Sequence, residues 1–426
     1  MRQLRAILST AVIMLALAIG SLLSPCPVTP SQQSAYDSPH HPSTSPWIQD
    51  LDYLANQLPK RHKNLFFKIS PEEFTRNVNE LRHDIPNLTD YEVVVSMMAI
   101  VASIGDSHTM LNAHFSGIFH QLPVTIEWFS DGLYVMKAPP SYADIVGKRI
   151  VSINDKSVEE TASMIKPVVP HENDAQFKNR APQYLTVPEV LAALNITDSP
   201  DSVPFSVESV GTAFIRPQTI GPDSNWVSVF DDMSCSPPLY LQNQDQHYWF
   251  TYLTEALAVY AQYNACNEMK ELAFASFTDD LFNFVDSHVV NKFIFDIRLN
   301  GGGNSSIARP VIDDVKRRKS INKEGSLFVI IGRKTFSSAI LNALEFKHET
   351  NAIFVGESTG GKPNHYGEVR FLTLPNSGII VTYSTKYFEN SSEDTPSLYP
   401  DINVERSFSD VVTCKDPALD AILDYE

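Results

Sequence analysis

Four short segments of this chain combine residue types that could act on a substrate, and two of them hold a serine and a histidine. Ser337 and Ser338 stand between an apolar strand pattern and a helix pattern. A serine there lies at the positive end of the helix dipole, where a nearby oxyanion is stabilised. His108 lies in the polar segment 105–109 after an apolar helix pattern, a setting that suits a general base. Taken singly, each residue has a plainer explanation: Ser337 or Ser338 could simply cap the helix, and His108 could be a structural histidine.

The other two segments are rich in glycine. Residues 300–304 read N-G-G-G-N after a buried strand pattern, and glycines there let backbone N–H groups face a ligand without a side chain in the way. Residues 356–363 read G-E-S-T-G-G-K-P. This second segment looks like a phosphate-binding loop, but Pro363 stands where that loop needs serine or threonine, and no helix pattern follows. Lys362 therefore needs another explanation than nucleotide binding.

Composition excludes several kinds of partner and cofactor. The 426 residues carry 33 basic and 50 acidic side chains, a formal net charge of −17, without a basic cluster. We therefore expect no nucleic-acid partner. Neither C-x-x-C nor H-E-x-x-H occurs, so the sequence predicts no metal and no cofactor. Cys26 lies near the amino-terminal segment, and one disulfide is possible among the other three cysteines, Cys235, Cys266 and Cys414.

The amino terminus has the features of an export signal. Residues 1–25 begin with basic side chains and continue with an apolar run, which is typical of a secretory signal peptide, with an uncleaved membrane anchor as the alternative. Residues 26–46 are rich in proline, serine and histidine and read as a linker. We therefore expect a secreted or otherwise extracytoplasmic protein.

The remaining chain divides into three stretches that must position the four segments. Residues 47–120 show helix patterns with capping signals. Residues 121–235 are strand-like, with a stretch rich in proline, asparagine and aspartate at 166–203 that reads as a long insertion. Residues 236–426 alternate strand and helix patterns, which implies parallel β-α-β units, and runs near 369–387 read as a hairpin.

Together, the four segments resemble one family, the serine peptidases that include the tail-specific and carboxyl-terminal processing proteases and the tricorn core protease. The most specific parts of this similarity have the order and spacing of the family. They are D-I-R-L-N-G-G-G at 296–303, T-F-S-S-A at 335–339, V-G-E-S-T-G-G-K at 355–362 and a late P-D-I at 400–402. It implies an α/β fold with a crotonase/ClpP-like catalytic domain and an N-terminal helical subdomain. Segments 131–135 and 147–154 are similar to a degenerate, β-rich PDZ-like domain.

By this resemblance the protein is a serine-type endopeptidase that acts on peptides or unfolded proteins through an acyl-enzyme. Ser337 would be the nucleophile. The backbone N–H groups of Ser338 and of a glycine, Gly302 or Gly301, would form the oxyanion hole, and each donor is worth a few kcal/mol in the transition state.

The resemblance offers two bases for the serine. The processing proteases use a lysine, and Lys362 falls on that position, whereas the tricorn branch uses a histidine preceded by a serine, which Ser107 and His108 match. We favour His108, because an imidazole needs little pKa tuning and a lysine needs burial to lower its pKa from about 10.4. Ile340 also stands where the processing proteases usually have glutamate.

Two further alternatives accompany this assignment. Glu389 fits best as the carboxylate that completes the relay, with Glu393 close to it, and His365 is a remoter candidate for the base. The same fold also occurs in an extracellular carrier of retinoids and fatty acids, so the alternative function is non-catalytic binding of apolar ligands. The retained Ser337, His108 and glycine turn favour the enzyme.

Overall fold

The computed structural model describes residues 45–113, 116–218, 225–231 and 233–426. The predicted signal peptide or anchor at 1–25, and almost all of the linker at 26–46, lie outside the described residues. Within the described ranges, no helix combines the length and the apolar character that crossing a membrane requires.

Three helices form the amino-terminal part, as predicted. Their starts follow the capping signals in the sequence: the Ser70 side chain accepts a hydrogen bond from the Glu73 N–H, and Thr89 forms a capping box with Glu92. The third helix is buried around most of its circumference, because its side chains contribute to a core that continues into the β-rich part of the molecule. The helices are α2 (Pro46–Arg61), α3 (Pro71–Asp84) and α4 (Asp90–Ala102).

An antiparallel sheet follows, in the strand order β2-β3-β4-β6-β7. The sheet lies in the stretch that shows strand patterns in the sequence, and helix α5 (Val158–Ile165) begins after a capping box formed by Ser157 and Glu160. Two short strands pair at its sides, β5 with β4 and β8 with β3. The bounds are β2 (Thr125–Phe129), β3 (Gly132–Ala138), β4 (Arg149–Ile153), β5 (Lys156–Ser157), β6 (Val203–Val207), β7 (Gly211–Ile215) and β8 (Val227–Ser228).

The stretch at 166–203, which reads as a long insertion, contains helices α6 (Asp174–Leu185) and α7 (Pro188–Ala193). The residues that suggested a loop are helix-start residues: the Asn173 side chain accepts a hydrogen bond from the Gln176 N–H, and Pro188 is the first residue of α7. Helix α6 packs on β2, and α7 packs on α4. This segment therefore belongs to the structural framework.

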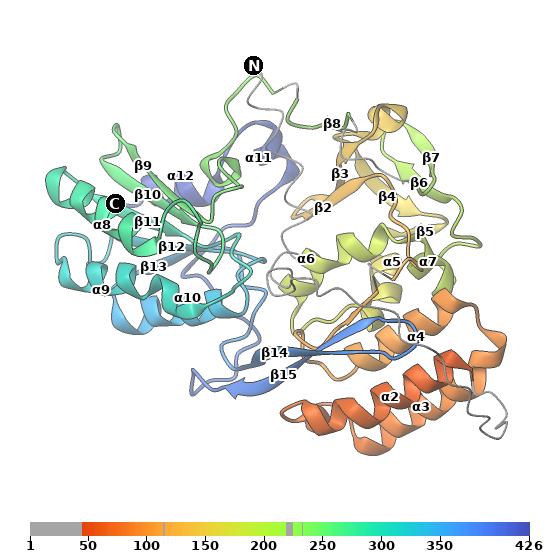
Figure 1. Cartoon of the computed structure of the whole chain (residues 1–426). Coiled ribbons are helices and arrows are strands. Elements are labelled where there is room, and N and C mark those ends of the chain that lie inside the picture. Colours follow the sequence, from red (N-terminus) through yellow and green to blue (C-terminus); the bar gives the residue numbers. More distant parts are fainter. Residues whose placement is uncertain (1–44, 114–115, 219–224, 232) are drawn as a thin grey trace, which may run out of the picture.

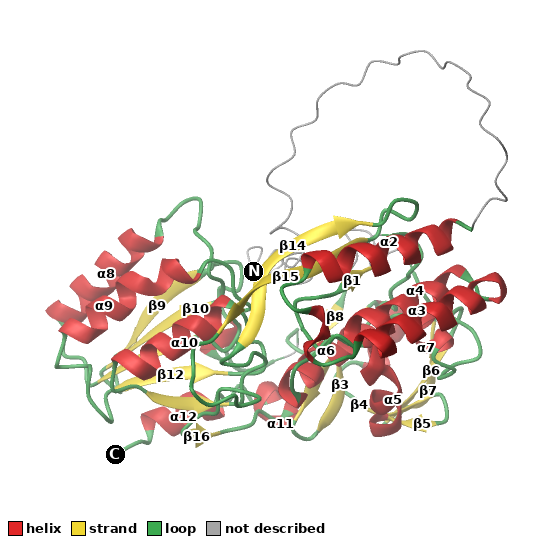
Figure 2. Ribbon diagram, turned by 90° about the horizontal axis from the view of Figure 1, so that it is seen from below, coloured by secondary structure: helices red, strands yellow, loops and turns green. Residues whose placement is uncertain are grey.

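The carboxyl-terminal part is built on a six-stranded sheet of order β16-β13-β12-β11-β10-β9, parallel except for the edge strand β9. Helices α8 (Phe274–Ser287), α9 (Arg309–Arg317) and α10 (Ser338–Glu349) cover one face and α12 (Pro417–Leu423) the other (Figures 1 and 2). The predicted α/β fold class is confirmed. The strands are β9 (Tyr248–Leu253), β10 (Ala258–Tyr263), β11 (Lys292–Asp296), β12 (Leu327–Ile331), β13 (Ile353–Gly356) and β16 (Ile402–Asn403).

The predicted hairpin forms from β14 (His365–Thr373) and β15 (Ile380–Phe388), but its strands do not belong to the six-stranded sheet. It makes a separate sheet with the short strand β1 (Leu111–Asn112), in the order β1-β15-β14. Figure 2 shows the hairpin reaching from the six-stranded sheet to the amino-terminal helices. This pairing brings the chain just after residue 108 to the carboxyl-terminal part of the molecule.

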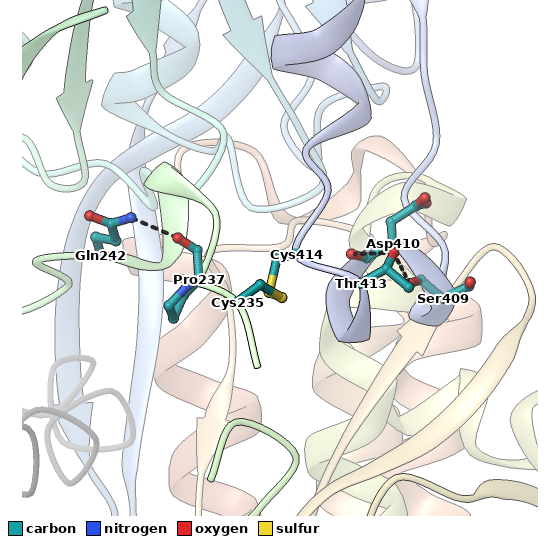
Figure 3. Close-up of a disulfide and its surroundings, with 7 residues drawn as sticks. All are labelled: Cys235, Pro237, Gln242, Ser409, Asp410, Thr413 and Cys414. Carbon is teal, nitrogen blue, oxygen red and sulfur yellow. Dashed lines mark hydrogen bonds between the residues drawn. A yellow bond between two sulfur atoms is a disulfide. The ribbon is translucent and has the colours of Figure 1, made fainter. Parts of the chain in front are cut away.

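One disulfide joins Cys235 to Cys414 across 179 residues of sequence (Figure 3). Cys266 is a buried free thiol. Cys414 lies just after helix α11 (Phe408–Val412). The Phe408 ring in that helix stacks on Tyr134 of β3 with centroids 4.1 Å apart. The end of the chain is thus attached to the β-rich part both covalently and by aromatic packing.

Candidate active site

Ser337 has a strained backbone at the start of α10. Its φ of 55° and ψ of −125° lie outside the regions that a residue other than glycine ordinarily adopts. Its side chain makes no capping hydrogen bond, so the plainer explanation as a helix cap does not hold for Ser337. Strain of this kind persists only where the surroundings impose it, and it concentrates at functional sites.

The surroundings that impose this conformation are the end of β11 and the turn that follows it. The Thr335 hydroxyl donates to the Ile297 carbonyl at 3.0 Å, and it accepts a hydrogen bond from the Gly332 N–H at 3.0 Å. The Phe336 N–H donates to the Asn300 carbonyl at 3.1 Å. The serine turn and the glycine turn are therefore one hydrogen-bonded unit.

Gly302 lies directly against the serine. A Cβ added to Gly302 would stand 2.7 Å from the Cβ of Ser337 and 3.1 Å from the backbone nitrogen of Ser338. As the first residue of α10, Ser338 has an N–H without an intrahelical acceptor. The Gly302 N–H donates to the Asn300 side-chain oxygen at 2.9 Å. The structure thus brings the predicted nucleophile and the predicted oxyanion-hole segments together.

His108 reaches this turn through the β1–β15 pairing. The Thr382 hydroxyl of β15 donates to the His108 carbonyl at 2.8 Å, and the Thr382 N–H donates to the Met110 carbonyl at 2.9 Å. The His108 imidazole stacks on the Phe336 ring, with centroids 4.3 Å apart and planes 24° apart. The predicted base therefore packs on Phe336, the residue that immediately precedes the predicted nucleophile.

The side-chain polar atoms of Ser107 and His108 are buried without hydrogen-bond partners in the described part of the chain. Only 6% of His108 is exposed, and within the described ranges neither ring nitrogen has a hydrogen-bond partner. The Ser107 hydroxyl is equally buried and unpaired. Nearly all buried polar groups in folded proteins are paired. Unpaired buried side-chain atoms are therefore concentrated at Ser107 and His108.

Two carboxylates flank the imidazole. Asp106 Oδ1 lies 3.8 Å from His108 Nδ1, and Asp106 Oδ2 lies 2.9 Å from Nε2 of the buried His62. Burial would raise the pKa of Asp106, but the neighbouring His108 and His62 hold that pKa well below its usual range. The second carboxylate is Glu172, whose pKa is raised by burial, although the charge of His108 acts in the opposite direction.

Glu172 is the site residue that the sequence did not indicate. It lies just before α6, in the stretch that reads as an insertion, and its only sequence signal is the helix-capping Asn173 beside it. Glu389 is exposed immediately after β15, and Glu393 is also exposed. The role of Glu389 in the relay stays a prediction.

Lys362 has a carboxylate partner of its own. Its Nζ lies 3.0 Å from Asp394 Oδ1, on the edge of the site. Its carbonyl oxygen lies 2.9 Å from Nδ1 of the buried His365, and the His365 ring lies 5.9 Å from the His108 ring. Burial lowers the pKa of His365 to about 4, so this imidazole is neutral near pH 7.

Helix α6 supports both sides of the site. The Asn173 side chain donates to the carbonyls of Thr359 and Gly360, at 3.1 and 3.2 Å, and so fastens the glycine-rich turn that precedes Lys362. The Arg180 guanidinium donates to the Ser107 carbonyl at 3.0 Å and lies over the Phe336 ring. The helix thereby fixes the backbone around His108 and the serine turn relative to each other.

Comparison with known proteins gives the class of this fold. Residues 308–404, which contain Ser337 and Lys362, match peptidase family S41. This match confirms the resemblance of the sequence to this family of serine peptidases.

Solved structures of CPAF share the fold over most of both chains. Mature CPAF complexed with lactacystin is 12% identical over 89% of this chain and 97% of its own, with a TM-score of 0.59. Mature CPAF alone is 13% identical over 89% of this chain and 96% of its own, with a TM-score of 0.58. A CPAF mutant is 12% identical over 89% of this chain and 96% of its own, with a TM-score of 0.61. No curated protein sequence gives a significant match.

Proposed function

We propose that this peptidase is an endopeptidase that cleaves peptides or unfolded proteins through an acyl-enzyme on Ser337. The observation that carries the proposal is the strained Ser337, with its hydroxyl free of any capping bond, packed against Gly302 and next to the Phe336 ring that stacks on His108. This arrangement has a nucleophile, a base and backbone donors at one point, which is what acyl transfer requires.

In the proposed mechanism His108 is the general base. It takes the proton from the Ser337 hydroxyl as the oxygen attacks the carbonyl carbon, and it later gives that proton to the leaving amine. The Ser338 N–H is one oxyanion donor. The other comes from the glycine turn, either from Gly301 or from Gly302 once its N–H exchanges Asn300 for the oxyanion.

We assign Glu172 and Asp106 to the stabilisation of the imidazolium that forms on His108. The facing atoms of the three side chains lie within 4.8 Å of one another. A carboxylate beside a histidine favours the protonated ring, and two of them in a buried site do so more strongly than one in water. Lys362 is less suited to the role of base, because its ammonium is paired with Asp394.

Active-site labelling tests this proposal. A fluorophosphonate probe should label the wild-type protein and fail to label Ser337→Ala. His108→Ala should lower kcat about 10²- to 10⁴-fold, whereas Lys362→Met should stay within about fivefold of wild type. An active His108→Ala with a dead Lys362→Met would reverse the choice of base. Absence of labelling together with tight fatty-acid binding would favour the carrier.

We also propose that the protein works outside the cytoplasm, with the β-rich domain as a degenerate PDZ-like module. The Cys235–Cys414 disulfide supports this location, since disulfides persist in oxidising compartments. Anchoring through residues 1–25 remains the alternative to cleavage. Amino-terminal sequencing of the exported protein decides between the two, and a cytosolic, reduced, full-length chain would contradict the location.

A further inference from the structure

The groups around His108 can also hold a metal ion, and we propose that Asp106, His108 and Glu172 form a site for Zn²⁺ that inhibits the peptidase. One nitrogen of the histidine and one oxygen of each carboxylate all lie within 4.8 Å of one another. The residues come from two distant segments, which is why the sequence shows no metal-binding motif. Zinc binding stands independently of the proposed function, whereas inhibition rests on it.

The unpaired atoms of the site point to a ligand. Both ring nitrogens of His108 and the Glu172 Oε2 atom are buried without a hydrogen-bond partner in the described part of the chain. Leaving such groups unpaired costs about 1–3 kcal/mol each, and a cation bound to one ring nitrogen and to the Glu172 oxygen removes that cost for these two atoms. Arg180 donates hydrogen bonds to the carbonyls of Ser107 and Pro170.

The donor set selects zinc among common divalent cations. One imidazole with two carboxylates suits Zn²⁺, which binds nitrogen and oxygen at about 2.0–2.2 Å in tetrahedral geometry, so its ligand atoms lie about 3.4 Å apart. In the structure the three ligand atoms lie within 4.8 Å of one another, so side-chain rotation has to bring them to this shorter separation. Mg²⁺ and Ca²⁺ prefer sets of oxygen ligands. Water would take the fourth position on zinc.

Asp106 is held in an orientation that suits a ligand. Its Oδ2 is engaged by His62 and by the Thr109 hydroxyl at 2.5 Å. Its Oδ1 accepts a hydrogen bond from the His108 N–H at 2.9 Å and lies 3.8 Å from Nδ1 of the His108 ring. Partners on the outer oxygen of a metal-binding carboxylate orient it and strengthen binding, typically by 10- to 100-fold. This orientation exists before any ion arrives.

Inhibition follows from the chemistry of imidazole. A neutral imidazole that binds a metal through one nitrogen carries its proton on the other. His108 in that state cannot accept the proton of Ser337, whichever nitrogen holds the ion. Zinc should therefore stop the acylation step without touching the serine.

Calorimetry on the chelator-treated full chain tests the binding. The Ser337→Ala variant, which cannot digest itself, should bind one Zn²⁺ per chain. Adding Glu172→Gln should weaken that binding at least tenfold, because the neutral amide loses the charge and most of the affinity of the carboxylate. Adding Glu72→Gln, on the exposed face of α3, should change nothing. No binding at micromolar Zn²⁺, or equal binding in both double variants, would overturn the site.

Peptidase assays test the inhibition separately. Stoichiometric Zn²⁺ should abolish wild-type activity, a chelator should restore it, and Mg²⁺ at the same concentration should have no effect. Zinc that binds with the expected variant pattern but leaves the activity intact would overturn the inhibitory role. A chain that binds zinc as expected and has no peptidase activity under any condition would refute the proposed function and leave the metal site standing.

Discussion

A single methyl group at Gly302 should separate the catalytic role of the glycine turn from its structural role. In Gly302→Ala the new Cβ would stand 2.7 Å from the Ser337 Cβ, so the turn or the serine must move by about 0.7 Å to reach ordinary contact. Displacements near 1 Å cost about 10²-fold in rate. We therefore expect kcat to fall about 10²-fold or more. Because alanine tolerates the φ of +108° at this position poorly, the free energy of unfolding should also fall, by about 1–2 kcal/mol.

Gly301→Ala is the matched control, because alanine keeps the backbone N–H that could act as an oxyanion donor and its Cβ would meet no atom within 4 Å. It should keep kcat within about threefold and unfold within about 1 kcal/mol of wild type. Peptide hydrolysis under saturating substrate gives kcat, and urea unfolding gives the stability. If Gly302→Ala retains wild-type kcat, or if both variants are equally impaired, the packing of the glycine turn on the serine does not serve catalysis.

The other predictions concern stability. His365 has a pKa of about 4 when folded and about 6.5 when unfolded, so the unfolded chain binds the extra proton between these values. The free energy of unfolding should therefore fall by about 3 kcal/mol as the pH drops from 6.5 to 4. Urea unfolding across this pH range should show a weaker dependence of stability on pH for His365→Gln than for wild type. An equal pH dependence in the two proteins would contradict this assignment to His365. Cys235→Ser combined with Cys414→Ser should cost about 2–5 kcal/mol, measured by urea unfolding without reductant, and a loss below 1 kcal/mol would show that the bridge constrains little.

Local signals in the sequence account for much of the fold. The capping residues Ser70, Thr89 and Ser157 mark the starts of three helices, and the strand pattern at 149–153 and the apolar run at 327–331 coincide with β4 and β12. Such features act within a few residues of each other, so they can be read without the tertiary structure.

The stretch at 166–203 shows where this kind of reading fails. Pro188 and Asn173 are typical of loops as well as of helix starts, and composition does not separate the two. What makes α6 and α7 helices is their packing on β2 and α4, and packing partners that lie far away in the sequence leave no local trace.

The sequence by itself determined the class of chemistry, because the serine, the histidine and the glycine turns are short motifs whose order identifies a serine peptidase. Only the tertiary structure decided which groups share the site. Glu172 reaches His108 because β1 pairs with β15 and α6 is fastened to the catalytic part of the chain. Electrostatic and metal-binding contacts depend on distances between side chains, and these distances are set by long-range packing.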